Sequence, residues 1–230
     1  MYRCVFIDLD DTLWDFKSNS KDVLNEIYHQ MSLGQYFDTF ENYYSLYAVR
    51  NKELWDLYSK GVVTKEYLNH ERFNHPFAQI GVHNEVLAQS INQQYFKMLP
   101  FRTTLMPHTI EVLEYLYRKY TLTIVSNGFE ELQYNKIKSA SIEKYFSHIV
   151  LSQTANALKP NPLIFEYALS LNNASVHETV MIGDNYLADI CGARNAGMDQ
   201  IYYNPQAALP LDQIAPTFSI NSLLELKDIL

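Results

Sequence analysis

The 230-residue sequence predicts an α/β protein with a Rossmann-like parallel sheet of strand order 3-2-1-4-5, helices on both faces of the sheet, and an α-helical cap inserted after the first strand. Two observations predict this fold. Short apolar runs alternate with segments of helical periodicity, which is typical of βαβ units with right-handed crossovers. From Ser20 to Met98 the alternation stops, and no convincing strand occurs. We therefore expect a core formed by residues 1–15 and 101–230 and an all-α cap formed by residues 16–100.

The expected core elements are short strands and the helices between them. The strands are Tyr2–Leu9, Leu122–Val125, Ile149–Leu151, Thr179–Ile182 and Ile201–Tyr203. The helices are Ile110–Tyr117, Leu132–Ala140, Pro162–Leu171, Leu187–Ala196 and Leu223–Leu230. Pro162 suits the first turn of its helix, and Gly197 suits a position just past a helix end.

Four helices are expected in the inserted segment. They are a helix capped by Ser20 that reaches Met31, a helix over Phe40–Tyr58 ended by Gly61, a helix capped by Thr64 and stopped by Pro76, and a stripe of apolar residues from Val86 to Tyr95. Serine and threonine side chains accept hydrogen bonds from the first turn of a helix, and proline removes a backbone donor inside one.

Composition excludes several classes of partner. The formal net charge is −8 and no block of basic residues occurs, so neither a nucleic acid polymer nor a membrane surface is expected as a partner. The two cysteines, Cys4 and Cys191, lack metal-type spacing, which favours a reduced, cytoplasmic protein. We expect no secretory signal and no membrane span, and the sequence leaves the oligomeric state open.

Acidic residues follow the first strand directly. Alternation along an extended chain directs Asp8 and Asp10 to the same side. Like charges this close repel each other, and a hard divalent cation relieves that repulsion. Mg²⁺ prefers one or two carboxylates together with phosphate oxygens of a substrate. A solvated acidic turn is the alternative interpretation of this segment taken alone.

Three more polar segments follow predicted strands. They are Ser126-Asn127-Gly128, Lys159-Pro160, and Gly183-Asp184 with Asp189 one turn further on. Taken singly, these segments are a common turn, a surface loop and a helix cap. Ligand sites in open α/β sheets gather at the carboxyl ends of strands, near a change in strand order. A central first strand, as in the order 3-2-1-4-5, would bring all four segments together.

Such a cluster suits phosphoryl transfer, in which catalysis consists mainly of positioning and charge neutralisation. Asp8, Asp10 and Asp184 offer oxygen ligands for Mg²⁺, and Lys159 offers a positive charge for phosphoryl oxygens. Ser126 offers a hydroxyl, and Gly128 offers an unobstructed backbone N–H group for an anion. One carboxylate can attack phosphorus covalently, and a second can protonate the departing oxygen and then deprotonate water.

The four segments, in this order, resemble the four motifs of the haloacid dehalogenase superfamily. The resemblance implies that Asp8 is the nucleophile that becomes an aspartyl-phosphate, with Lys159 steadying it. It implies that Asp10 is the general acid and base and binds Mg²⁺ through its backbone carbonyl. The insert resembles the small α-helical cap of that superfamily.

The resemblance also implies roles for the remaining motif residues. Asp184 would bind Mg²⁺, and Ser126 with the backbone of Asn127 and Gly128 would hold the phosphoryl group. Thr12 would support the loop, and Asp189 would act through water or by orienting Lys159.

The acid at position 10 favours phosphate-ester hydrolysis, because the dehalogenases of the superfamily typically lack it. A phosphomutase uses the same pair of acids, so a sugar-phosphate phosphatase or mutase is the alternative enzyme. A non-catalytic binding protein is a weaker alternative, since Asp8, Asp10, Lys159 and Asp184 are all present.

Substrate choice is expected to depend on aromatic and basic residues near or within the insert. The candidates are Trp14, Phe16, Trp55, Tyr58, Arg72 and Phe73. Aromatic faces suit a nucleobase, and ordinary packing inside the cap is the favoured alternative for any single one of them.

A second resemblance makes the expected substrate more specific. Asn51-Lys52-Glu53-Leu54-Trp55, Tyr58, Gly61, Asn69-His70-Glu71-Arg72-Phe73, Ser126-Asn127-Gly128-Phe129 and Pro216-Thr217-Phe218-Ser219-Ile220 are similar to the noncanonical pyrimidine nucleotidases. This resemblance implies a Mg²⁺-dependent 5′-nucleotidase that acts on a nucleoside monophosphate such as dUMP, dTMP or UMP.

Overall fold

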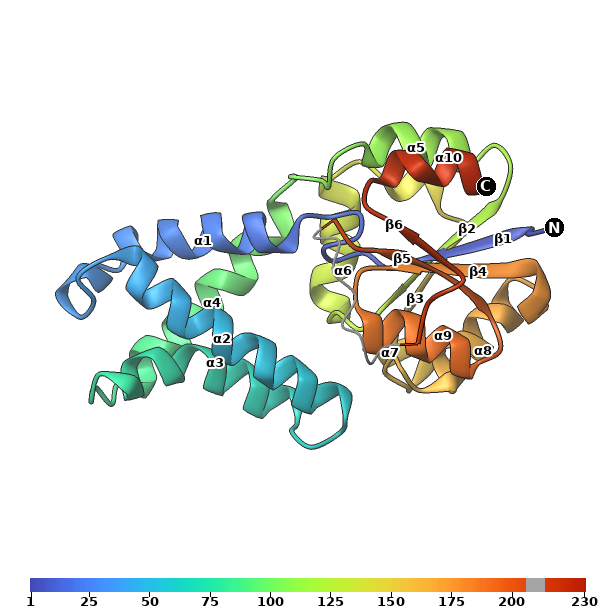
Figure 1. Ribbon diagram of the computed structural model, residues 1–230. Coiled ribbons are helices and arrows are strands. Elements are labelled where there is room, and N and C mark those ends of the chain that lie inside the picture. The colour runs from blue at the N-terminus through green and yellow to red at the C-terminus, as the bar shows by residue number, and fades with distance from the viewer. Residues whose placement is uncertain (206–213) are drawn as a thin grey trace. The chain divides into compact units, whose positions relative to one another are not determined.

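The computed structural model describes residues 1–205 and 214–230 of the chain. The chain forms two compact units, one made of Met1–Phe16 and Thr103–Leu230 and the other of Lys17–Arg102. The first unit is the α/β core and the second is helical (Figure 1).

A six-stranded parallel sheet of order β3-β2-β1-β4-β5-β6 forms the centre of the core. The strands are β1 (Cys4–Ile7), β2 (Thr121–Ser126), β3 (His148–Leu151), β4 (Thr179–Gly183), β5 (Asp199–Tyr203) and β6 (Phe218–Ile220). The predicted order of the first five strands is confirmed. β1 is central, with Ile7 opposite Ile124 on one side and Ile182 on the other. The strands β2 and β3 are added on one side of β1, and β4 to β6 are added on its other side. Ligand-binding residues are expected where this order changes, at the ends of β1 and β4.

Helices cover both faces of this sheet (Figure 1). They are α5 (Thr109–Leu116), α6 (Glu130–Ser139), α7 (Ser152–Ala155), α8 (Pro162–Leu171), α9 (Gly192–Asn195) and α10 (Leu226–Ile229). α5 and α10 lie on one face, and α8 and α9 lie on the other (Figure 1). Pro162 occupies the first turn of α8, as predicted, and Asn161 caps that helix.

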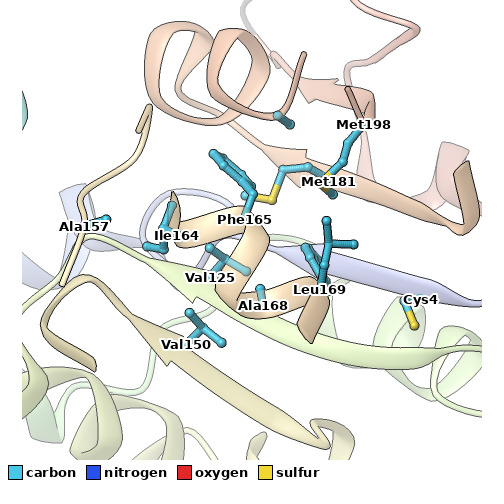
Figure 2. Packing of buried hydrophobic residues seen from close by; sticks show 12 residues of the cluster. Cys4, Val125, Val150, Ala157, Ile164, Phe165, Ala168, Leu169, Met181 and Met198 are labelled. Atoms are coloured by element: carbon cyan, nitrogen blue, oxygen red, sulfur yellow. The ribbon is translucent and has the colours of Figure 1, made fainter. Parts of the chain in front are cut away.

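The face beneath α8 contains a tightly packed apolar cluster. Figure 2 shows Phe165, Ala168 and Leu169 of α8 packed against Val125 of β2 and Met181 of β4. Both faces of a parallel sheet are buried, which explains the continuous apolar runs of its strands. This packing fixes the strands and therefore the positions of the residues at their carboxyl ends.

The helical unit consists mainly of α1 (Phe16–Gln30), which begins at the end of the core unit, α2 (Phe40–Ser59), α3 (Lys65–Gln79) and α4 (Glu85–Met98). Its interior is aromatic: Tyr47 stacks on Phe73 with 5.4 Å between ring centroids, and the rings of Phe73 and Tyr95 meet edge to face with centroids 5.2 Å apart. Thr64 caps α3 as predicted, accepting a hydrogen bond from the Tyr67 N–H group.

Two predictions about helix ends in this unit are wrong. Ser20 does not cap α1, which begins at Phe16. The Ser20 hydroxyl is instead buried 2.9 Å from the Tyr95 hydroxyl. Pro76 does not stop α3, which continues to Gln79. Pro76 is buried with Phe77 on that helix. We attribute the continuation of the helix, despite the backbone N–H group that proline lacks, to this packing.

The C-terminal part of the core also differs from the prediction. The strand β6 was not expected, because three residues with one buried side chain give little periodicity. The helix expected over Leu187–Ala196 is a π-helical turn over Tyr186–Cys191 followed by the short α9. A π-turn widens the backbone locally and often occurs at functional sites.

Among the described residues, no helix combines the length and apolar character that a membrane crossing requires.

Replacement of Phe165 by alanine tests the packing beneath α8. We expect Phe165→Ala to lower the free energy of unfolding by about 3–5 kcal/mol, because the side chain is fully buried and its loss leaves a cavity. Urea unfolding measures this change. Leu163→Ala on the same helix is the control, since Leu163 is 54% exposed. An equal loss in both variants would contradict the packing described here.

Candidate active site

A tight turn after β1 presents the first acidic residues. The N–H groups of Leu13 and Trp14 both donate to the Leu9 carbonyl, and the Asp11 N–H group donates to the Trp14 carbonyl. Asp11 adopts a left-handed conformation with φ of 61°, which aspartate tolerates better than most residues. This turn holds Asp8 and Asp10 at the carboxyl end of the central strand.

The ammonium group of Lys159 lies between two buried carboxylates. Its Nζ atom is 2.6 Å from Asp8 Oδ1 and 2.7 Å from Asp189 Oδ1, and it also donates to the Val125 carbonyl at 2.7 Å. Lys159 is only 2% exposed and Asp189 is fully buried. The sequence left open how Asp189 acts, and the structure gives a direct ion pair with Lys159.

The side chain of Asn127 holds Lys159 in place. Its Nδ2 donates to the Lys159 carbonyl at 2.8 Å, and its Oδ1 accepts from the Lys159 N–H group at 2.7 Å. The amide of Asn127 is therefore directed to the backbone of Lys159. A contact between Asn127 and a phosphoryl group, as predicted, would have to come from its backbone.

The charges in this cluster shift the pKa values of both partners. Burial raises the pKa of Asp8 to about 7; Lys159 opposes this rise and Asp189 adds to it. Burial lowers the pKa of the Lys159 ammonium, but Asp189 and Asp8 outweigh burial, so this pKa lies above its ordinary value. Lys159 thus stays charged, whereas the surrounding protein does not fully neutralise the negative charge of Asp8.

Asp8, Asp184 and Asp189 form a set of carboxylates that fits a divalent cation. One oxygen of each lies within 4.8 Å of the others, and a single ammonium group faces two of them. The excess negative charge and the all-oxygen donor set match what Mg²⁺ requires. The predicted metal residues Asp8 and Asp184 belong to this set, and its third member, Asp189, was not predicted as a metal ligand.

Thr12 links two of these carboxylates. Its hydroxyl oxygen lies 3.4 Å from Asp8 Oδ2 and 3.3 Å from Asp184 Oδ1, and it accepts from the Asp184 N–H group at 3.1 Å. Gly183 precedes Asp184 and leaves room for Asp189, because a Cβ atom there would be 2.2 Å from Asp189 Oδ2.

The carboxylate of Asp10 lies apart from that set, against α6. Its Oδ1 is 2.7 Å from Lys136 Nζ, and its Oδ2 accepts from Gln133 Nε2 at 2.9 Å. Gln133 and Lys136 were not predicted as site residues. The available signal was their spacing, which places both on the face of α6 that also carries the buried Ile137.

Ser126 and Gly128 lie beside the same helix. The Ser126 hydroxyl oxygen accepts from Gln133 Nε2 at 2.7 Å and from the Gly128 N–H group at 3.1 Å. The sequence predicted an unobstructed Gly128 N–H group, but this group is already bonded to the Ser126 hydroxyl oxygen. The glycine is needed instead for space, because a Cβ atom at Gly128 would lie 2.1 Å from Gln133 Nε2.

The candidates for substrate contact have varied environments. Trp14 is fully buried and lies beneath Lys136, with 4.6 Å from its ring centroid to Nζ, and Phe16 is 5.5 Å from the same atom. Arg72 and Phe73 are buried within the helical unit, where the Arg72 guanidinium lies 4.9 Å from the Phe73 ring. Burial of Trp14, Arg72 and Phe73 favours packing over substrate contact.

Trp55 and Tyr58 remain the half-buried aromatic candidates of the helical unit. Their rings meet edge to face on α2, with centroids 5.7 Å apart. They stay predicted substrate contacts.

Fold and site together define a Rossmann-like α/β protein with a lysine-bridged acidic centre at the carboxyl ends of its strands. The family model "Haloacid dehalogenase-like hydrolase" matches residues 5–203, and the chain belongs to this family. The predicted family is thereby confirmed.

Known relatives extend over almost the whole chain. The chain is 29% identical over 227 residues to Pyrimidine 5′-nucleotidase YjjG of Escherichia coli, covering 98% of this chain and 96% of that protein. It is also 29% identical to a glyceraldehyde 3-phosphate phosphatase of Methanothermobacter thermautotrophicus, over 90% of this chain and 87% of the relative. The crystal structure of the HAD-hydrolase YfnB of Bacillus subtilis bound to magnesium is similar with a TM-score of 0.89 and 26% identity, covering 99% and 98% of the two chains.

Removal of the Lys159 charge tests the bridge between the two carboxylates. We expect Lys159→Met to lower the free energy of unfolding by about 3–5 kcal/mol, because two buried carboxylates lose their cation. The loss should be larger at about pH 8 than at about pH 5, since protonation of Asp8, whose pKa burial raises to about 7, relieves the repulsion at low pH. Urea unfolding in EDTA measures both values.

Lys138→Met is the control for this experiment, because Lys138 is exposed on α6. A loss in Lys159→Met that does not exceed the loss in Lys138→Met would contradict the proposed bridge.

Proposed function

We propose that this protein is a Mg²⁺-dependent phosphomonoester hydrolase that acts through an aspartyl-phosphate on Asp8. The observation that carries this proposal is the Lys159 ammonium group held 2.6 Å from Asp8 and 2.7 Å from Asp189 at the carboxyl ends of the strands. This arrangement keeps a buried carboxylate next to fixed positive charge, which suits attack on an anionic phosphoryl group.

The chemical course uses two carboxylates in turn. An oxygen of Asp8 forms a bond to phosphorus while the bond from phosphorus to the ester oxygen breaks, and Asp10 gives its proton to that departing oxygen. Asp10 then takes a proton from water, the water oxygen bonds to phosphorus, and the bond to Asp8 breaks. Inorganic phosphate and an alcohol leave, and Asp8 is regenerated.

The remaining residues would neutralise and orient the reactants. The carboxylates of Asp8 and Asp184, the nearby Asp189 and the backbone carbonyl of Asp10 are the groups available to a magnesium ion. When bound, that ion supplies charge neutralisation for Asp8 and for the phosphoryl oxygens. Lys159 and the Ser126 hydroxyl would bind phosphoryl oxygens.

For the substrate, we propose a pyrimidine nucleoside 5′-monophosphate such as dUMP, dTMP or UMP. The supporting observations are the similarity of the helical insert to pyrimidine nucleotidases and the near-complete coverage of the relative named as a pyrimidine 5′-nucleotidase. A sugar-phosphate phosphatase is the second candidate, supported by the relative named glyceraldehyde 3-phosphate phosphatase. A phosphomutase would share the same core residues.

A phosphate-release panel tests the activity and the substrate class together. With Mg²⁺ we expect faster release from dUMP, dTMP or UMP than from sugar phosphates, and EDTA should abolish release because the carboxylates lose their counter-charge. Asp8→Asn should lower kcat by at least about a thousandfold, since the nucleophile is lost.

Asp22→Asn controls for the change of one aspartate, because Asp22 is exposed on α1. Faster turnover of a sugar phosphate than of any nucleotide would contradict the proposed substrate and support a sugar-phosphate phosphatase. An Asp8→Asn variant as active as the parent would overturn the proposed mechanism.

A further inference from the structure

Two polar side chains on α6 are buried beside the proposed site. Gln133 is fully buried and Lys136 is 2% exposed, although α6 otherwise has a mostly polar sequence. A buried ammonium group is unfavourable unless it is paired, and a buried amide must form hydrogen bonds. The two residues lie three positions apart and so share one face of the helix.

Lys136 pairs with Asp10 and with the aromatic rings beside it. Its Nζ atom lies 2.7 Å from Asp10 Oδ1 and sits over the rings of Trp14 and Phe16, at 4.6 and 5.5 Å from their centroids. The aromatic faces attract the cation and limit its movement to one side. Lys136 therefore holds one oxygen of Asp10 in a defined direction.

Gln133 connects Asp10 to Ser126. A single nitrogen of Gln133 reaches both partners: Nε2 donates to Asp10 Oδ2 at 2.9 Å and to Ser126 Oγ at 2.7 Å. The Gln133 Oε1 atom is buried and has no hydrogen-bond partner among the described residues. An unsatisfied buried acceptor is unfavourable. We infer that the two hydrogen bonds donated by Nε2, and not the contacts of Oε1, determine the position of this amide.

The contacts of Ser126 direct its proton. The oxygen accepts from Gln133 and from the Gly128 N–H group, as described above. A hydroxyl oxygen that accepts twice keeps its own hydrogen for donation to a third group. That hydrogen is then available to a phosphoryl oxygen.

We propose that Gln133 and Lys136 are positioning residues: Lys136 orients the carboxylate of Asp10 for proton transfer to the departing oxygen, and Gln133 couples that carboxylate to the phosphate-binding hydroxyl of Ser126. This inference rests on the proposed hydrolase function. Proton transfer depends on a well-aligned donor, and an unrestrained carboxylate meets that requirement for less of the time. Two lone-pair positions remain on the Asp10 oxygens, and one of them can carry the proton that passes to the departing oxygen.

The test compares esters whose leaving groups differ in their need for a proton. dUMP releases a poor leaving group, whereas p-nitrophenyl phosphate releases one that needs little protonation. The ratio kcat/KM covers the steps up to phosphoryl transfer to Asp8. We expect Lys136→Met to lower kcat/KM about a hundredfold for dUMP but only about threefold for p-nitrophenyl phosphate, because only the first requires an acid.

The other variants separate positioning from folding. Lys136→Arg should recover at least about tenfold of the dUMP loss, since it restores a cation that pairs with a carboxylate. Gln133→Leu should raise the inhibition constant of inorganic phosphate about tenfold, because the Ser126 hydroxyl loses its orientation. Lys136→Met should leave that constant nearly unchanged, and Lys138→Met should leave all values unchanged.

Equal loss on both esters in Lys136→Met, without recovery in Lys136→Arg, would overturn the inference. A crystal structure of Lys136→Met gives a readout independent of activity: we expect the Asp10 carboxylate to turn away from α6, and an unchanged orientation would also overturn it. If the parent hydrolysed neither ester, the proposed function would fail, and the orientation of Asp10 would still decide this inference.

Discussion

The site depends on one buried ammonium group placed between two carboxylates. Without Lys159, Asp8 and Asp189 would bring like charges into an interior that stabilises neither of them. With it, the protein can keep a carboxylate next to the end of the central strand, although burial still raises the pKa of Asp8. The remaining deficit of positive charge is what a divalent cation would supply. The Asn127 amide binds the backbone of Lys159 and so keeps the Lys159 ammonium group in place.

The arrangement of the core could be predicted because its signals are local and numerous. Continuous apolar runs mark the buried strands, and Asp8 and Asp184 follow two of them directly, so the parallel sheet brings these residues together. Local signals did not predict the continuation of α3 through Pro76 or the presence of β6. The packing of Pro76 inside the helical unit overrides a helix-breaking preference, and a three-residue edge strand carries too few side chains to give a period.

The site was predicted in its residue types more fully than in its contacts. The predicted strand order placed Lys159 near Asp8, but only the folded chain gives its direct pair with Asp189. Gln133 and Lys136 resembled solvent-facing residues of a polar helix, because sequence does not show which neighbour covers a helix face. Their burial becomes evident once α6 lies beside the turn that carries Asp10. Side-chain direction is thus the information that periodicity leaves out.

Identification of the phosphorylated residue is the sharpest test of covalent catalysis by Asp8. The reaction with Mg²⁺ and dUMP, or the fastest ester found, is quenched rapidly, and acyl phosphates are reduced with borohydride before peptide mapping. Reduction of an aspartyl-phosphate converts that residue to homoserine. We expect homoserine at position 8 in the parent protein and none when substrate is omitted. Homoserine at another position, or phosphate release with position 8 always unmodified, would contradict it.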